Sequence, residues 1–513
     1  MSSLSNITEV RLGDTIGLNQ FMAVARHNAK VTFSQNYRQR VDKARAVVEK
    51  WVAEEKVMYG VTTGFGALCT RAISGQETVA LQRNIILSHS TSVGEPLTIE
   101  QARATMLMVL QNLGQGYSGV RFVVLERLGE FLNLGLSPWM PREGSVGYLS
   151  PEAHMSLCLI GEGQIYYGTE LMPAAEALKK AGLEPLVLGA KEGLALISGT
   201  TSVTALASLA IYDLIQAARA ADIIGALNLE TVGGVIRAFD PRVMSVRPHQ
   251  EQGRTAENVC RILADSEIIQ SGGSGRVQDA LSLRCIPQLH GAAKKLLLNA
   301  LDTIETEMNS CCDNPIVWPD EGNEDVISAC NADSSYVGSA MDTAAIAATM
   351  LGKMSERRNN RLIDETLSGF PCFLIKEPGL NSGLMIPQYT QAGLLNDMRI
   401  LSTPASIDNT PTCAAQEDYV AMGYNAAKKA VAVAEKLEYI LAIELLSVFE
   451  AQNFLEHGKK CGAASEAVYA EIGKHVPKME QDMFLYPHII YLKELIHSGR
   501  LATVVEELIG PLK

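Results

Sequence analysis

The sequence predicts a mainly helical protein in which a bundle of long helices follows a smaller N-terminal domain. Five segments beyond residue 200 carry apolar residues at helical spacing with few glycines or prolines inside them: 201–232, 286–310, 335–365, 385–402 and 415–455. Most exceed the roughly three to four turns of an ordinary helix, and long helices bury their apolar faces in a bundle. Aromatic residues make up only 6% of the chain, which favours helix over strand. We therefore expect a mixed, mostly helical domain over residues 1–200, and the bundle with short C-terminal helices over residues 201–513.

The charge and cysteine content exclude several functional classes. The formal net charge is −13, whereas nucleic acids and anionic membranes select basic surfaces, so we expect neither partner and predict a small-molecule substrate. The ten cysteines include no C-x-x-C pair, which argues against a zinc cage and a disulfide framework. The N-terminus lacks a basic-then-apolar leader, and no apolar run approaches the roughly 20 residues that span a bilayer. These features predict a soluble cytoplasmic protein.

Two segments in the first 100 residues have the features of ligand-contacting regions. A helix expected over residues 34–58 runs into the segment Tyr59–Gly66, which contains three glycines and two threonines within eight residues. Glycine-rich backbone adopts positive φ and approaches a ligand closely, although a plain turn has the same composition. His89 ends a helical segment over residues 81–90, where a lone histidine is more often structural than catalytic.

The stretch Gly144–Ser150 is the most informative part of the sequence. Gly144-Ser-Val-Gly147 and Leu149-Ser-Pro-Glu-Ala-His-Met155 resemble the two flanks of the signature segment of histidine and aromatic amino-acid ammonia-lyases. In that family an Ala-Ser-Gly tripeptide and an aspartate lie between the flanks, and the tripeptide cyclises into an electrophilic methylidene-imidazolone group. Here Tyr148 alone fills the gap, so the sequence contains no precursor of the electrophile.

The resemblance covers the chain from about residue 50 to about residue 455 and rests on several motifs in family order. They are Tyr59-Gly-x-x-Thr-Gly-Phe-Gly66, Leu81-Gln-Arg with Ser88-His89, Gly193-Leu-Ala-Leu196, Gln278-Asp279 with Ser282-Leu-Arg-Cys285, Asp313-Asn-Pro315, Ser355-Glu-Arg-Arg358, Asn381-Ser-Gly383 and Gln416-Glu-Asp418. The resemblance implies a long central helix bundle of the ammonia-lyase and fumarase-like type. It also implies a homotetramer in which loops from three chains form each active site. No metal or organic cofactor is implied.

Several departures from the family pattern occur at positions that contact the electrophile or the amine. Ser198 stands where the family has an asparagine, Leu281 where it has a tyrosine, and Ala332 where it commonly has a phenylalanine. Lys376 lies where the resemblance to histidine lyases predicts no lysine. Together with Tyr148, these departures resemble the ergothionase subfamily, which eliminates trimethylamine from ergothioneine to give thiourocanate. A trimethylammonium nitrogen has no lone pair to donate and departs as a neutral amine, so we expect a betaine substrate and acid–base catalysis without the electrophile.

The resemblance implies a role for each candidate site residue. Tyr59 is the expected base for the β-proton, and a nearby cation or hydrogen bond must lower its pKa from about 10 for this role near neutrality. Lys376 is expected to protonate or hydrogen-bond the ring, and Arg284 to hold the carboxylate through two parallel hydrogen bonds. Glu417 is expected to bind a ring N–H or to pair with Lys376. The expected substrate contacts are His89, Tyr148, Ser198, Asn331 and Gln416.

The same residues have ordinary structural explanations. Lysines in loops are mostly solvated, so Lys376 has that alternative, and Glu417 on a helix has the alternative of a surface ion pair. Asn331 has the residue type of a helix cap and is as well explained by that role as by substrate binding.

Two other functions stay open at this stage. An ordinary histidine or aromatic amino-acid ammonia-lyase, its prosthetic group omitted from the written sequence, would release ammonia, although Ser198 and Leu281 weigh against it. A non-catalytic homologue would bind a metabolite or act as a structural subunit. The presence of Tyr59, Arg284 and Glu417 weighs against that second alternative.

Overall fold

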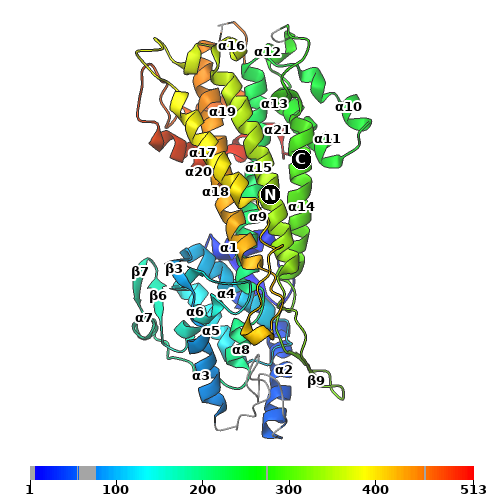
Figure 1. Ribbon diagram of the computed structural model, residues 1–513, viewed down its shortest axis with the longest axis vertical. Helices are drawn as coiled ribbons and strands as arrows, with labels where there is room; N and C mark the ends of the chain where they lie inside the picture. The colour runs from blue at the N-terminus through cyan, green and yellow to red at the C-terminus, as the bar shows by residue number, and fades with distance from the viewer. Residues whose placement is uncertain (1–5, 55, 57–76, 273–274, 456–457) are drawn as a thin grey trace. The chain divides into compact units, whose positions relative to one another are not determined.

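A computed structural model describes residues 6–54, 56, 77–272, 275–455 and 458–513. It is mainly helical, which confirms the predicted fold class (Figure 1). The chain forms two compact units, each built from three segments. Unit 1 comprises Met1–Leu209, Leu301–Met341 and Pro404–Lys428, and unit 2 comprises Ala210–Ala300, Asp342–Thr403 and Lys429–Lys513.

One of the five chain boundaries between the units lies between Thr403 and Pro404, and the other four fall inside four long helices. These are α9 (Thr201–Thr231), α14 (Ile286–Met308), α15 (Ser335–Ile363) and α18 (Gly423–Ala451). Each of these helices therefore contributes one end to unit 1 and the other to unit 2. The sequence-based division had instead cut the chain once, between residues 200 and 201.

Unit 1 combines short helices with small sheets. Its helices outside the four long ones are α1 (Leu18–Ala25), α2 (Gln35–Ala53), α3 (Thr78–His89), α4 (Ile99–Leu113), α5 (Phe122–Leu134), α6 (Glu152–Leu159), α7 (Ala174–Lys180), α8 (Glu192–Ile197) and η5 (Cys413–Ala415). Its strands are β1 (Glu9–Leu12), β2 (Lys30–Phe33), β3 (Val93–Pro96), β4 (Leu136–Pro138), β5 (Pro141–Glu143), β6 (Gln164–Tyr167), β7 (Glu170–Pro173), β8 (Ile316–Trp318) and β9 (Asp325–Ile327). Strands β1 and β2 pair in parallel, whereas β3–β5, β4–β6–β7 and β8–β9 are antiparallel.

Helix α2 illustrates how the sequence sets these elements. The Ser34 hydroxyl accepts a hydrogen bond from the Tyr37 N–H (3.1 Å) and caps the helix. Val41, Val48 and Trp51 lie on the predicted apolar face and are buried. Val48 and Trp51 pack with Val317 and Ala190 in one core cluster, so α2 joins the segment before α8 to strand β8.

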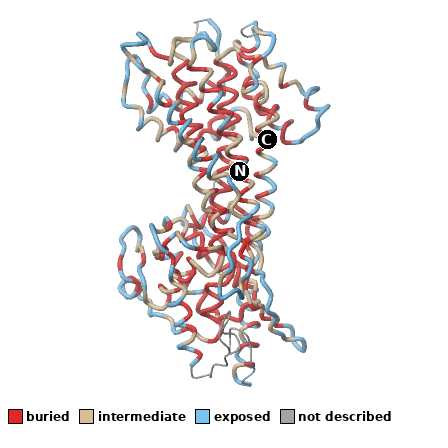
Figure 2. The backbone as a smooth tube through the Cα atoms, in the orientation of Figure 1, coloured by how far each residue is buried: buried red, intermediate tan, exposed pale blue. Residues whose placement is uncertain are grey.

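Unit 2 contains the remaining helices. These are η3 (Ile236–Phe239), α10 (Pro241–Ser245), α11 (Gln250–Ile262), α12 (Glu267–Gln270), α13 (Leu281–Arg284), α16 (Glu365–Ser368), η4 (Cys372–Leu374), α17 (Met385–Leu401), η6 (Gln452–Phe454), α19 (Ala463–Ile472), α20 (Tyr486–His497) and α21 (Arg500–Ile509). In Figure 2 the buried residues of this unit follow the long helices. The apolar faces predicted from the sequence are therefore the core of the bundle.

A buried polar network ties the four long helices together in unit 2. Arg358 of α15 donates to both carboxylate oxygens of Glu444 on α18 (2.6 and 2.8 Å), and Asn228 of α9 donates to the same carboxylate (3.0 Å). On α14, His290 lies 2.9 Å from Asp222 of α9. Burial lowers the pKa of the His290 imidazole although Asp222 opposes this. A buried charge without its partner is costly, so this network favours one register of the helices.

The segment 192–231 is long and apolar enough to cross a membrane by length and composition. The apolar window that meets this criterion is entirely buried inside the protein. Complete burial is typical of a helix in a protein core. Helix α9 forms most of this segment. The expectation that no apolar run reaches membrane-spanning length was therefore wrong for this segment.

Replacing Glu450 with glutamine is expected to stabilise the protein at pH 8 more than at pH 5. Glu450 is buried at the end of α18, where its carboxylate accepts from the Met479 N–H (3.1 Å) and the Asn453 amide (2.9 Å). Burial raises its pKa from 4.5 to about 7, although these hydrogen bonds and Lys478 oppose the shift. Between about pH 4.5 and 7 the unfolded chain loses this proton before the folded protein does, so stability falls with rising pH by up to about 3 kcal/mol. Urea midpoints of both proteins at the two pH values check this, and parallel pH dependences would contradict it.

Candidate functional site

Unit 1 contains a cavity of about 400 Å³ formed by three loop regions. The lining consists of residues 146–148, Asn314 with 328–330 and 332–334, and residues 416, 417 and 419–421. The first region precedes α6, the second lies on both sides of the pair β8–β9 and leads into α15, and the third precedes α18. Three predicted site residues, Tyr148, Gln416 and Glu417, therefore line one cavity although they are far apart in sequence.

Tyr148 contacts a second predicted residue at this cavity. Its hydroxyl oxygen lies 3.3 Å from the Ser198 hydroxyl oxygen. The Ser198 hydroxyl in turn accepts from the Asn314 N–H (3.0 Å), and the Ser198 carbonyl accepts from the Asn112 amide (3.2 Å). Ala332 also lines the cavity and is only 4% exposed. The residues that depart from the family pattern at 148, 198 and 332 thus occupy one neighbourhood.

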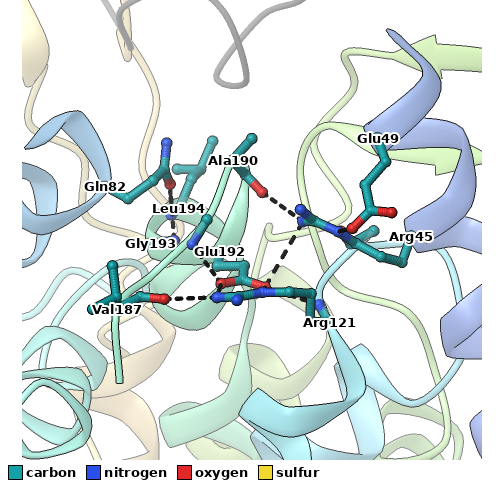
Figure 3. Close-up of polar contacts among 11 residues, drawn as sticks. Arg45, Glu49, Gln82, Arg121, Val187, Ala190, Glu192, Gly193 and Leu194 are labelled. Atoms are coloured by element: carbon teal, nitrogen blue, oxygen red, sulfur yellow. Dashed lines mark hydrogen bonds and ion pairs between the residues drawn. The ribbon is translucent and has the colours of Figure 1, made fainter. Parts of the chain in front are cut away.

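The position of Ser198 follows from how helix α8 is anchored. Glu192 begins α8, and Ser198 is the cap residue directly after its last residue, Ile197. Figure 3 shows the Glu192 carboxylate between Arg121 and the backbone before the helix. Glu192 is fully buried and accepts from Arg121 Nε (2.7 Å) and Nη2 (2.6 Å) and from the Gly189 N–H (2.6 Å). This ion pair raises the pKa of the Arg121 guanidinium and fixes the start of α8.

Gln82 of α3 supports the same helix from another side. Its side-chain oxygen accepts from the Gly193 N–H (2.8 Å) and the Leu194 N–H (3.4 Å), as drawn in Figure 3. A Cβ atom at Gly193 would lie 2.5 Å from the Gln82 carbonyl oxygen, so only glycine allows this approach. The family-like motifs that contain Gln82 and Gly193 therefore hold α3 against α8.

A buried ion pair joins α8 to the segment that carries Asn314. Lys191 precedes α8 with a φ of 72°, and its ammonium lies 2.7 Å from the Asp313 carboxylate. Both side chains are 0% exposed. The second Asp313 oxygen accepts from the Asn314 N–H (2.7 Å). The pair thus fixes Asn314 beside Ser198 at the cavity.

Glu417 and His89 are electrostatically coupled. Glu417 lines the cavity, and its carboxylate accepts from the Thr412 hydroxyl (3.0 Å). His89, at the end of α3, donates from Nδ1 to the Ile85 carbonyl (2.8 Å). Burial lowers the pKa of the His89 imidazole, while the Ile85 hydrogen bond and the negative charge of Glu417 oppose that shift. His89 is therefore close enough to respond to the charge of Glu417.

The other predicted residues lie elsewhere or outside the described chain. Tyr59 is outside the described residues. Arg284 and Lys376 belong to unit 2 and are not among the residues that line the cavity. The Arg284 guanidinium donates to the Asp279 carbonyl (2.9 Å). Lys376 is half-exposed, and its ammonium pairs with the Glu480 carboxylate (2.5 Å). Asn331 adjoins the lining and donates to the Cys311 carbonyl (3.3 Å), and the departing Leu281 is 61% exposed on α13. Their catalytic and substrate-contact roles stay predictions.

The cavity also includes residues that sequence reasoning did not select. Cys330 and Asp333 flank the predicted pair Asn331 and Ala332, and both line the cavity. Tyr419 lines it as well, and its hydroxyl oxygen lies 2.5 Å from the Ser335 hydroxyl oxygen. Adjacency to Asn331 and to Gln416-Glu417 was the available signal, since residues beside a motif in a loop frequently share its cavity.

One group of described residues has the composition of a metal site. Asp213, Glu438 and His497 in unit 2 bring ligand atoms within 4.8 Å of one another. His497 Nδ1 lies 2.8 Å from Glu438, and the Lys493 ammonium pairs with the other Glu438 oxygen (3.2 Å). A lysine charge on the same carboxylate opposes cation binding, so we interpret this group as an ion-pair network.

Comparison with known proteins places the chain among amino-acid lyases. A family model described as aromatic amino acid lyase matches residues 16–474. The histidine ammonia-lyase of Symbiobacterium thermophilum is 44% identical over 98% of this chain and 99% of that protein. The solved histidine ammonia-lyase of Trypanosoma cruzi is 34% identical with a TM-score of 0.90, covering 97% of this chain and 95% of that one. The solved ergothionase of Treponema denticola is 27% identical with a TM-score of 0.89, covering 96% and 99%.

These comparisons correct the expectation of an ergothionase. Relatives named histidine ammonia-lyase are 39–44% identical over nearly the whole chain, well above the 27% identity to the ergothionase. Elimination of trimethylamine from ergothioneine was therefore the wrong main prediction, and the ammonia-lyase alternative is better supported. The error arose because a few departures, three of them around one cavity, were given more weight than the several hundred other positions.

Proposed function

Because the chain belongs to the aromatic amino acid lyase family, we propose that it is a carbon–nitrogen lyase of the histidine ammonia-lyase type. The reaction is the elimination of ammonia from L-histidine to give the conjugated imidazole acrylate. The observation that carries the proposal is the near full-length similarity to histidine ammonia-lyases together with a cavity that gathers Tyr148, Gln416 and Glu417. Histidine is preferred over aromatic amino acids because the relatives with the higher identities bear that name.

The signature stretch does not fit the methylidene-imidazolone group that the family resemblance implies. Gly147 is followed directly by Tyr148, so the Ala-Ser-Gly precursor is missing. A Cβ atom at Gly147 would lie 2.5 Å from the Ser334 hydroxyl oxygen, which leaves little room there for a larger residue. We therefore assign no step to that group. The mass of the peptide that contains Gly147 and Tyr148, measured in the purified protein, reports directly whether residues absent from the written sequence are present.

The proposed roles at the cavity concern binding and proton transfer. Glu417 binds a ring N–H of the substrate, since an ionised carboxylate accepts strongly from such a donor. Tyr59 remains the proposed base, with a contribution of about 10²–10⁴-fold for a positioned base. Arg284 remains the proposed partner of the substrate carboxylate. Lys376, paired with Glu480, remains a proposed ring contact.

We also propose that the protein acts as a homotetramer. Unit 2 has an apolar hollow of about 480 Å³ lined by residues of α17 and α18 and by residues 483–490. Large apolar side chains are exposed beside it, among them Tyr389 at 65% and Phe484 at 75%. Contiguous exposed apolar surface is typical of an interface between subunits, which supports the assembly. Light scattering of the eluted protein tests it.

Protection of Cys330 by histidine tests whether substrate binds in this cavity. The thiol lines the cavity, so bound histidine should slow its alkylation by iodoacetamide, as measured by peptide mass mapping. Cys260 in unit 2, a thiol whose pKa burial also raises, is the control, and its alkylation should be unaffected. Equal alkylation of Cys330 with and without saturating histidine would contradict binding at this cavity.

A further inference from the structure

The described lining of the cavity has an uncompensated negative charge. Asp333 and Glu417 are its two carboxylates, and none of the described residues that line it is a lysine, arginine or histidine. Two tyrosines, Tyr148 and Tyr419, complete the lining with aromatic rings. Carboxylates and aromatic faces both attract organic cations, and a cavity lined by one sign of charge strengthens that attraction.

Both carboxylates are fixed by contacts of their own. Asp333 accepts from the Ser335 N–H (2.9 Å) at the start of α15, while its own N–H donates to the Cys330 carbonyl (3.2 Å). Glu417 is held by the Thr412 hydroxyl (3.0 Å) and by backbone pairing with the same residue. Anchored carboxylates define a site with a fixed arrangement of charge, whereas solvated surface side chains do not.

The pKa of the Cys330 thiol responds to the negative charges at the cavity. Burial raises its pKa most, and the carboxylates of Asp333 and Glu417 raise it further. Both charges therefore act on the same point of the lining. Tyr419, whose hydroxyl contacts Ser335, brings its ring to the residue that anchors Asp333.

We infer that Asp333 is a specificity-determining residue that selects ligands carrying an ammonium group, with the two tyrosine rings beside it and with the charge of Glu417, which binds the ring N–H, adding to the negative field. The ligand class is small amino acids and amines with a protonated amine, and analogues that keep the carboxylate but lack the amine gain nothing from Asp333. This inference rests on the proposed function, because it assigns the ammonium end of the proposed substrate to Asp333. It concerns binding, so it is measured without turnover.

Calorimetry with two histidine analogues tests the inference on the full-length protein. L-Histidinol keeps the imidazole and the ammonium group but has no carboxylate, whereas imidazole-4-propionate keeps the imidazole and the carboxylate but has no amine. Asp333→Asn should weaken histidinol binding by about tenfold or more, since it removes one charge-assisted contact. The same substitution should leave imidazole-4-propionate binding unchanged or improved.

The substitution removes charge while keeping the fold. Asparagine retains an oxygen that accepts from the Ser335 N–H, so α15 keeps its cap. Asp325→Asn is the matched control: Asp325 also accepts from a following backbone N–H (2.8 Å), on strand β9, but does not line the cavity. It should change neither affinity. Asp333→Asn should also speed alkylation of Cys330, because removing a negative charge lowers that thiol's pKa.

Histidinol that fails to bind the wild-type protein, or binds the Asp333→Asn variant equally well, would overturn the inference. Failure of the proposed function gives a different result. The protein then releases no ammonia from histidine, while Asp333→Asn still weakens binding of histidinol and not of imidazole-4-propionate. The reverse outcome, turnover of histidine with no effect of Asp333→Asn on histidinol affinity, would keep the function and remove Asp333 from specificity.

Discussion

Asp313→Asn is expected to lower the free energy of unfolding by about 3–5 kcal/mol, because it leaves the Lys191 ammonium buried without a counter-charge. Both side chains of this pair are 0% exposed, and the ammonium lies 2.7 Å from the carboxylate. Asparagine retains an acceptor for the Asn314 N–H. The decrease in the free energy of unfolding is therefore due mainly to the missing charge and not to a lost backbone hydrogen bond. The urea midpoint of the variant, with the slope of the transition unchanged, measures the effect.

Asp320→Asn is the matched control for this prediction. Asp320 also pairs with a lysine, Lys43, at 3.0 Å, but both side chains are more than half exposed. An exposed pair contributes about 0–1 kcal/mol, so the midpoint should hardly move. The double substitution of Lys191→Met with Asp313→Asn should recover much of the loss, since the unpaired charge is then gone. Equal losses for Asp313→Asn and Asp320→Asn would contradict the buried-pair explanation.

Glu417→Gln is expected to lower kcat/KM for histidine by about 10–100-fold. The carboxylate lines the cavity and influences both His89 and Cys330, so it acts on the space where substrate is proposed to bind. A hydrogen bond to a charged group contributes about 1.5–3 kcal/mol, and glutamine keeps the shape but loses the charge. Steady-state assays give the ratio.

The neighbouring Asp418 provides a control within the same loop. Its side chain is exposed and does not line the cavity, so Asp418→Asn should leave kcat/KM within about twofold of wild type. The urea midpoints of both variants should match that of the wild-type protein. A Glu417→Gln variant with wild-type kcat/KM would remove Glu417 from the substrate site.

The sequence predicted the long helices well because their signal is local. Apolar spacing of three and four residues over more than twenty positions specifies a buried helix without knowledge of its partners. The membership of the two units was not accessible in the same way. Helices such as α9 and α18 are continuous in sequence, yet each contributes one end to each unit, and no composition change marks the boundary.

The site was partly predictable for a similar reason. Tyr148, Gln416 and Glu417 were selected from motifs and do line one cavity. Asp333 was missed although it lies two residues after Asn331, because the residue type alone does not separate a binding carboxylate in a loop from a helix cap. Only the three-dimensional structure, which brings residues 332–334 to residues 416–421, reveals the shared negative charge.

The substrate was the point at which local reasoning failed. Tyr148, Ser198 and Ala332 do gather at the cavity, so the grouping of the departures was meaningful. The prediction of an ergothionase from that group was wrong, because sequence identity across the whole chain is higher to histidine ammonia-lyases than to the ergothionase. A change in three or four side chains constrains the shape of a pocket more tightly than it constrains the substrate.

Parallel assays of the purified protein with L-histidine and with ergothioneine test the central claim most directly. Ammonia, trimethylamine and the conjugated imidazole product are quantified in each reaction. We predict ammonia and the imidazole acrylate in equal amounts from histidine, and no trimethylamine from ergothioneine. Trimethylamine from ergothioneine, with no ammonia from histidine, would contradict the assignment to the histidine ammonia-lyase type.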